Sequence, residues 1–186
     1  MQLMGHFTAI GMRVKVTEPD AMVINTCSGN DTAERGTLYS WSWSNPTNRA
    51  IVHRCPTDPQ YEAVSVEAMW QGTKIFQVDG TPDLTTLSGE WRRGKAKRPI
   101  GAWNGHNPLI TTPGEARVKI YIPCFKAIIE HWLQDPQVAE WVQTTRDHKG
   151  NIYLRDHDTG RGIHRNGPMS HAYLLCEYLN TGNWPV

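Results

Sequence analysis

The sequence predicts an α+β fold, in the form of a single compact, mainly helical domain with a few short strands. Two patterns lead to this class. Short stretches near the N-terminus alternate apolar and polar residues, as half-buried strands do. Longer stretches further along repeat their apolar residues with the period of a helix. The chain of 186 residues is 39% hydrophobic and 20% charged, which provides enough apolar material for one core.

The expected strands are short, and most of them precede the middle of the chain. We expect strands at 6–16, 21–26, 38–45, 50–53 and 152–154. In the segment 38–45, Tyr39, Trp41 and Trp43 alternate with polar residues. This segment is therefore either an aromatic strand or an extended segment that enters a site, and it ends at Asn45 before a proline.

The expected helices are marked by their period and by residues that begin or interrupt them. We expect helices at 66–76, 84–94, 115–134, 136–144 and 170–179. Ser65 is a suitable N-cap for the first, and Asp135 followed by Pro136 begins the fourth. Pro123 lies inside the third and should kink or restart it, because proline cannot donate the helical hydrogen bond.

Composition excludes several classes of function. The net charge of +1 argues against broad, sequence-independent binding to nucleic acid, but it leaves room for a local basic site. The four cysteines are far apart and form no C-x-x-C pair, so neither a zinc finger nor a secreted disulfide framework is expected. No apolar run is long enough for a signal peptide or a membrane span. We therefore expect a cytoplasmic protein without a membrane partner.

The helix expected at 66–76 has an unusual face. Glu67, Gln71 and Lys74 stand at i, i+4 and i+7, so they form one narrow polar stripe, and apolar residues cover both sides. Burying a charged side chain is unfavourable unless the group is paired or takes part in chemistry. The stripe is therefore a candidate site. The alternative interpretation is an ordinary solvated helix face.

A second group of acidic residues lies in the loop 155–162, at Asp156 and Asp158. Hydrolysis of glycosidic bonds uses two carboxylates, one that positions or activates water and one that stabilises the positive charge on the sugar. Glu67 with Asp156 or Asp158 would supply such a pair. Two alternatives remain: ordinary turn chemistry of aspartates, and a metal-dependent hydrolase centred on Asp156, His157 and Asp158, although the spacing matches no familiar metal motif.

The most basic stretch of the chain precedes a tryptophan. Arg93 and Arg98 belong to this run and could hold a phosphate, while Trp103 could stack on a base or ribose. A run of charges is also typical of a solvated face, and tryptophan is often part of a core. The sequence contains no G-x-S-x-G motif, so nucleophilic catalysis by serine has little support.

Ser65-Val66-Glu67, followed by Trp70-Gln71 and Lys74, resembles the central motif of the NADAR (YbiA-like) family. The resemblance extends over about Leu38 to Asn180. Its other matching segments are Ser42–Asn45, Arg93–Trp103, His131–Pro136, Gly150–Gly162 and Ala172–Leu179. Ala68 and His131 stand where the family usually has His and Lys, so the chain is similar to a divergent member.

This resemblance implies a fold and a reaction. The fold would be a YbiA-like domain over 38–186, with 1–37 as a strand and loop extension packed on it. The reaction would be hydrolysis of an N-glycosidic bond in a phosphorylated or ADP-ribosylated ribosyl compound, which is either an ADP-ribose–nucleobase or a ribosylamino-pyrimidine phosphate. The partner would be a small nucleotide-like substrate or an ADP-ribosylated nucleobase, free or within a nucleic acid.

The resemblance also implies roles for individual residues. Glu67, with Asp156 or Asp158, would be catalytic, and no metal or organic cofactor would be needed. The substrate would be held by Asn45, Gln71, Lys74, Arg93, Arg98 and Trp103. The alternative is a catalytically inactive module that binds a nucleotide or ADP-ribose in the same pocket. The oligomeric state is left open.

Overall fold

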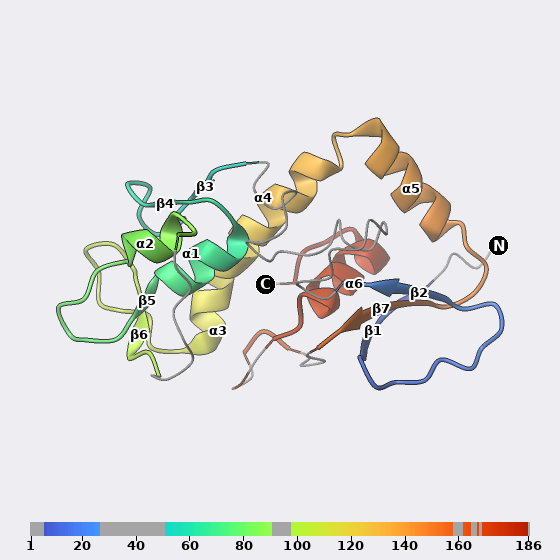
Figure 1. Cartoon of the computed structure of the whole chain (residues 1–186), viewed down its shortest axis with the longest axis horizontal. Helices are drawn as coiled ribbons and strands as arrows, with labels where there is room; N and C mark the ends of the chain where they lie inside the picture. The colour runs from blue at the N-terminus through green and yellow to red at the C-terminus, as the bar shows by residue number, and fades with distance from the viewer. Residues whose placement is uncertain are drawn as a thin grey trace. The chain divides into compact units, whose positions relative to one another are not determined.

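The chain folds into two compact units of mixed α and β structure (Figure 1). The computed structural model describes residues 6–26, 51–90, 98–157, 162–164, 167 and 169–185. The first unit comprises residues 1–40, 129–162 and 167–186, and the second comprises 41–128 and 163–166. No helix among the described residues is long and apolar enough to cross a membrane.

The first unit is built on a three-stranded parallel sheet. Its order is β1 (Phe7–Gly11), β7 (Ile152–Asp156) and β2 (Met22–Asn25). Both N-terminal strands pair with β7, with Phe7 and Met22 opposite Ile152 on its two sides. Two strands from the start of the chain thus hold a strand from near its end, although the local patterns gave no indication of their pairing.

Helix α6 (His171–Thr181) packs on β1 and β7 and covers the core of this unit. The Ser170 side chain accepts from the Tyr173 amide and begins the helix. Near its end, the Asn180 side chain exchanges two hydrogen bonds with the Phe7 backbone, at 2.9 and 2.8 Å. The buried apolar side chains of the unit include Phe7, Ile24, Ile152, Leu154, Leu174 and Leu175.

Helix α5 (Pro136–Arg146) also belongs to the first unit and confirms the predicted start of a helix. The Asp135 carboxylate accepts from the Gln137 amide at 2.9 Å, and Pro136 occupies the first turn. An Asp-Pro pair is a strong local signal for the start of a helix. The aspartate accepts from an amide of the first turn, and the proline has no amide hydrogen that would need an acceptor there.

The second unit contains short helices and two small antiparallel sheets. Its elements are β3 (His53–Arg54), β4 (Glu62–Ala63), α1 (Val66–Gly72), β5 (Lys74–Ile75), α2 (Leu84–Leu87), β6 (Gly101–Ala102) and α3 (Pro113–Ala116). Strand β3 pairs with β4, and β5 pairs with β6. Helix α1 packs against α2, and the core includes Val66, Met69, Ile75, Leu87, Ile120 and Phe125.

Helix α1 begins as predicted but ends four residues early. Ser65 accepts from the Ala68 amide at 3.1 Å, which confirms the N-cap. The helix ends at Gly72, where an added Cβ would lie 2.5 Å from a Leu87 methyl carbon. Lys74 then starts β5, because its backbone pairs with that of Ala102. The pairing with a distant strand overrides the local helical pattern.

The long helical run is interrupted next to Pro123, as predicted. After α3, a π-helical turn (η3, Arg117–Tyr121) leads into α4 (Ile122–Trp132). At the junction, the Ile122 amide donates to the Arg117 carbonyl, five residues earlier. This wider turn directly precedes Pro123, which has no amide hydrogen to donate.

Two other predictions were too long, and two are confirmed. The strand expected at 6–16 ends at Gly11, where the Val14 amide turns back to the Gly11 carbonyl. The helix expected at 84–94 covers only Leu84–Leu87 among the described residues. The strand at 152–154 and the helix at 170–179 are present. The strand expected at 38–45 lies outside the described residues.

Candidate functional site

The polar stripe predicted on α1 forms a hydrogen-bonded row. Lys74 Nζ donates to Gln71 Oε1 at 2.7 Å, and Gln71 Nε2 donates to Glu67 Oε1 at 3.0 Å. We call Glu67, Gln71 and Lys74 the α1 row. Glu67 and Gln71 are one helical turn apart, and Lys74 reaches the row from the first position of β5.

The row lies beside aromatic side chains. Lys74 Nζ is 5.2 Å from the centroid of the Trp70 ring, and Trp70 makes an edge contact with Tyr121 at 5.5 Å. All three row residues and Trp70 are partly exposed. Burial lowers the pKa of Lys74 below its ordinary value, and the negative charge of Glu67 partly opposes this shift.

The geometry of the row fixes the orientation of its middle member. The Lys74 ammonium has only donors, and an ionised Glu67 has only acceptors, so the Gln71 amide must point its oxygen at Lys74 and its nitrogen at Glu67. A partly exposed carboxylate with a fixed neighbour can stabilise a cation or accept a proton from water. Carboxylates perform these two functions in glycosidases.

Trp103 is held firmly at its backbone and at its ring. Its amide donates to the Thr73 carbonyl at 2.9 Å, and its carbonyl accepts from Thr57 Oγ1 at 3.0 Å. Its indole Nε1 donates to Asp58 Oδ2 at 3.0 Å, and this bond is the main reason why the pKa of Asp58 is lowered. The Tyr61 ring meets the indole edge-on, with centroids 5.9 Å apart.

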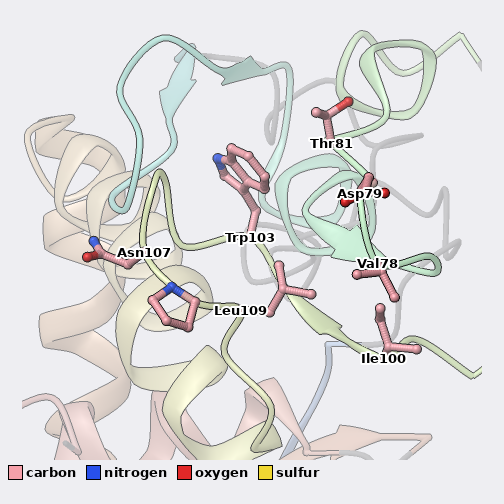
Figure 2. Close-up of a pocket in the computed structure, with 9 residues that line it drawn as sticks. Val78, Asp79, Thr81, Ile100, Trp103, Asn107 and Leu109 are labelled. Carbon is pink, nitrogen blue, oxygen red and sulfur yellow. The ribbon is translucent and has the colours of Figure 1, made fainter.

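The Trp103 ring forms part of the wall of an open cavity of about 520 Å³ (Figure 2). We call it the Trp103 pocket. It is lined by Val78, Asp79, Gly80, Thr81, Ile100, Trp103, Asn107, Pro108 and Leu109. The three residues of the α1 row are not among these lining residues. The backbone bond between Trp103 and Thr73 connects the pocket wall to the residue before Lys74.

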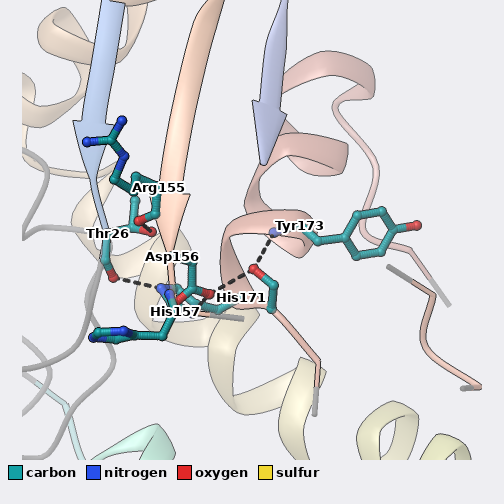
Figure 3. Close-up of polar contacts among 7 residues, drawn as sticks. Thr26, Arg155, Asp156, His157, His171 and Tyr173 are labelled. Carbon is teal, nitrogen blue, oxygen red and sulfur yellow. Dashed lines mark hydrogen bonds and ion pairs between the residues drawn. The ribbon is translucent and has the colours of Figure 1, made fainter. Parts of the chain in front are cut away.

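Asp156 lies at the end of β7 in the first unit, where it takes part in a buried cluster (Figure 3). The residue is 4% exposed. Its Oδ2 accepts from Ser170 Oγ at 2.7 Å and lies 2.9 Å from His171 Nδ1, and its Oδ1 accepts from the His157 amide at 2.6 Å. These contacts join the end of β7 to the start of α6, which is a structural role.

His171 completes this cluster and lies between two acceptors. Its Nε2 lies 2.8 Å from the Thr26 carbonyl oxygen, and its Nδ1 lies 2.9 Å from Asp156 Oδ2. The side chain is completely buried, and burial lowers its pKa well below the ordinary value. We call Asp156, Ser170, His171 and the Thr26 carbonyl the Asp156 cluster.

The predicted site residues therefore fall into three groups. Glu67, Gln71 and Lys74 are brought together, and Trp103 lies in the same unit on the wall of the Trp103 pocket. Arg98, which is exposed, also belongs to the second unit. Asp156 forms the second group, because it belongs to the first unit. The remaining predicted residues, Asn45, Arg93 and Asp158, lie outside the described residues.

A metal site was the alternative interpretation of the loop that begins at Asp156. Within the described part of the chain, no three His, Cys, Asp or Glu side chains gather in a way that could hold a metal ion. Asp158, the third member of that hypothesis, lies outside this part.

Sequence reasoning missed two features of the second unit. Asp58, which fixes the Trp103 indole, lies 45 positions away in the chain, and no local period could connect the two. His53 is 3% exposed, and neither of its ring nitrogens has a hydrogen-bond partner among the described residues. Burial lowers the pKa of His53 to about 4. His53 lies on a two-residue strand, which is too short for a sequence pattern to predict that its side chain is buried.

Fold and site together define a mixed α/β protein with a hydrogen-bonded polar row that begins on a short helix and ends on the strand after it. The chain belongs to a family of unknown function (DUF6939), whose model matches residues 38–175. Comparison with curated proteins and with solved structures gives no match.

Proposed function

We propose that the protein is a cytoplasmic N-glycosidase with a YbiA-like fold. Its substrate would be a phosphorylated or ADP-ribosylated ribosyl compound, and Glu67 would be its catalytic carboxylate. The observation that carries this proposal is the α1 row, in which a partly exposed carboxylate is held by a glutamine that is itself held by a lysine. The resemblance of the same residues to the NADAR motif supports it.

The proposed reaction makes one bond and breaks one. As the ribosyl C–N bond breaks, its electron pair leaves with the nitrogen, and positive charge builds on the ribose C1. A water oxygen bonds to that carbon and loses a proton to Glu67, and the departing base takes up a proton from solvent, to which Glu67 afterwards returns its own. An ionised Glu67 stabilises the developing cation by its charge and assists the attack as a base.

Gln71 and Lys74 would prepare Glu67 for these steps. The Gln71 amide donates to one carboxylate oxygen at 3.0 Å and so restricts the movement of the group. Lys74 lies close enough to interact electrostatically with Glu67, because the negative charge of Glu67 opposes the lowering of the Lys74 pKa by burial. Both are positioning residues in this proposal, and Lys74 could in addition hold a substrate phosphate.

The second carboxylate of the proposal is Asp156 or Asp158. The Asp156 carboxylate is buried and already accepts from Ser170 and the His157 amide. A group with these contacts gives up fold stability if it changes partners during a reaction. These contacts weigh against Asp156 in the second role.

The experiment is base release from a panel of ADP-ribosylated nucleobases, ribosylamino-pyrimidine phosphates and NAD, followed by mass spectrometry. We expect at least one substrate to release its base, and Glu67→Gln to lower the rate at least about 10²-fold while substrate still binds. Glu90→Gln, which alters a carboxylate outside the α1 row in the same unit, is the matched control and should keep full activity.

The other outcomes decide between the alternatives. Turnover that Glu67→Gln leaves unchanged would remove Glu67 from the mechanism. If no base is released but a nucleotide still binds, the inactive binding module is the better interpretation. Activity that is lost in excess chelator and restored by a divalent cation would favour the metal-dependent hydrolase.

A further inference from the structure

The Trp103 pocket combines exposed apolar side chains with an aromatic ring. Val78 is 84% exposed and Ile100 is 45% exposed, and both line it. Leu109 and Pro108 add further apolar surface, and Trp103 supplies an aromatic ring. A volume of about 520 Å³ lies within the range of small-molecule sites. The pocket therefore offers apolar contact to a flat ligand of moderate size.

Trp103 is oriented before any ligand arrives. The Asp58 carboxylate holds the indole nitrogen, and the Tyr61 ring meets the indole edge-on. The hydrogen bonds to Thr73 and Thr57 fix the backbone on both sides of its Cα. Ordering a side chain on binding usually reduces affinity, and here that ordering is already complete. A tryptophan with these contacts is a ready platform for stacking.

The charge of the lining selects among flat ligands. Among the described residues that line the pocket, Asp79 is the only formally charged one, and it is exposed. Thr81 and Asn107 add uncharged polar groups. An aromatic face together with a carboxylate favours a cation or a hydrogen-bond donor, and it disfavours an anion.

We propose that the Trp103 pocket binds a planar heteroaromatic ring that carries a positive charge or an amino group. The ring stacks on Trp103, and Asp79 pairs with its charge or its amino group. Asn107 and Thr81, which also line the pocket, offer further hydrogen-bonding groups. This inference does not depend on the proposed hydrolysis, because the α1 row does not line the pocket.

The test is an NMR titration of the full chain with three probes of similar shape: the N-methylquinolinium cation, neutral quinoline and a quinoline carboxylate. The indole N–H signal of Trp103 is assigned as the one missing from the spectrum of Trp103→Tyr. We expect the cation to shift this signal with an affinity about 3- to 10-fold above that of quinoline, and the carboxylate to bind more weakly than either.

Two variants separate stacking from charge. Asp79→Asn should remove the preference for the cation and leave the binding of neutral quinoline unchanged. Its matched control is Glu90→Gln, at a carboxylate that does not line the pocket, and this variant should keep the preference. Trp103→Leu should lower the affinity for all three probes about 5-fold or more, whereas Trp103→Tyr, which keeps an aromatic ring, should lower it less. Thermal melting checks that each variant is folded.

Three results would overturn the proposal. The first is the absence of any shift of the Trp103 signal at millimolar N-methylquinolinium. The second is an equal or higher affinity for the carboxylate. The third is an undiminished cation preference in Asp79→Asn. Because no result requires turnover, failure here is distinguishable from failure of the proposed hydrolysis.

Discussion

The α1 row and the Asp156 cluster are both chains of polar side chains that include a carboxylate, but their settings differ. In the Asp156 cluster, Asp156 and His171 are almost completely buried, and each contacts oxygen or nitrogen partners on other elements. In the α1 row, Glu67 and Lys74 are partly exposed, and both bond to Gln71, which is close by in the chain.

This difference separates fold stability from chemistry. A buried carboxylate with several partners holds segments together, and removing it leaves its partners without compensation. A partly exposed carboxylate in a local row contributes little to stability, but water and substrate can reach it. Both groups contain residues that the sequence suggested as catalytic, and only the tertiary contacts distinguish them.

The largest expected effect is on the Asp156 cluster. Asp156→Ala removes the acceptor of Ser170 and the carboxylate beside His171, so we expect the free energy of unfolding to fall by roughly 3–5 kcal/mol. Urea denaturation measures this loss. Glu140→Gln, at an exposed carboxylate of the same unit, is the control and should change the value by less than about 0.5 kcal/mol. Equal effects of the two variants would contradict the structural role.

His53 is a third case, because its imidazole is buried and has no hydrogen-bond partner in the described part of the chain. Its pKa is about 4 in the fold and 6.5 ordinarily, so between these values the unfolded chain binds more protons. Stability should therefore fall as the pH falls from about 6.5 to 4, by a contribution on the order of 3 kcal/mol. Denaturation at a series of pH values measures it.

The control for this pH effect is a pair of variants. His53→Leu should lose this part of the pH dependence, while His131→Gln, at an exposed histidine, should retain it. If His53→Leu and the natural chain show the same pH profile, the imidazole is not the source of the effect.

Lys74 should also make the free energy of unfolding rise with pH, but by a smaller amount and in the alkaline range. Burial lowers its pKa below 10.5, so between the folded and the ordinary value the unfolded chain holds more protons. Stability should rise as the pH increases through that interval, and Lys74→Met should lack the rise. At neutral pH this variant should change the free energy of unfolding by no more than about 1 kcal/mol. A loss of several kcal/mol would show that the row is structural.

Glu67→Gln should have the smallest effect on stability. The amide keeps the shape of the side chain, so the free energy of unfolding should change by less than about 1 kcal/mol. The shift of the thermal midpoint measures this change. The same variant is expected to lose activity, as described above. A change as large as that of Asp156→Ala would remove the contrast between the two groups.

Local chemistry made much of this fold predictable. Ser65 and Asp135 are side chains that cap helices by bonding to amides two or three residues away, so their function is visible in a short stretch. Pro123 marks an interruption for an equally local reason. The alignment of Glu67 with Gln71 follows from the helical period alone.

What the sequence could not supply depends on distant segments. The end of α1 follows from pairing between Lys74 and Ala102, which are far apart in the chain. The parallel partners of β7 come from the first part of the chain, and the alternation of a strand does not say which strand it joins. The Asp58 bond to Trp103 is equally invisible to a local pattern.

The sequence by itself determined which residues are available for chemistry: a carboxylate, an amide and an ammonium in phase on one helical stretch. The tertiary structure decided which polar groups are left accessible, because burial and hydrogen bonds between distant segments set their surroundings. Those surroundings bury Asp156 in a hydrogen-bonded cluster, hold the Trp103 indole against Asp58 and leave Glu67 partly exposed.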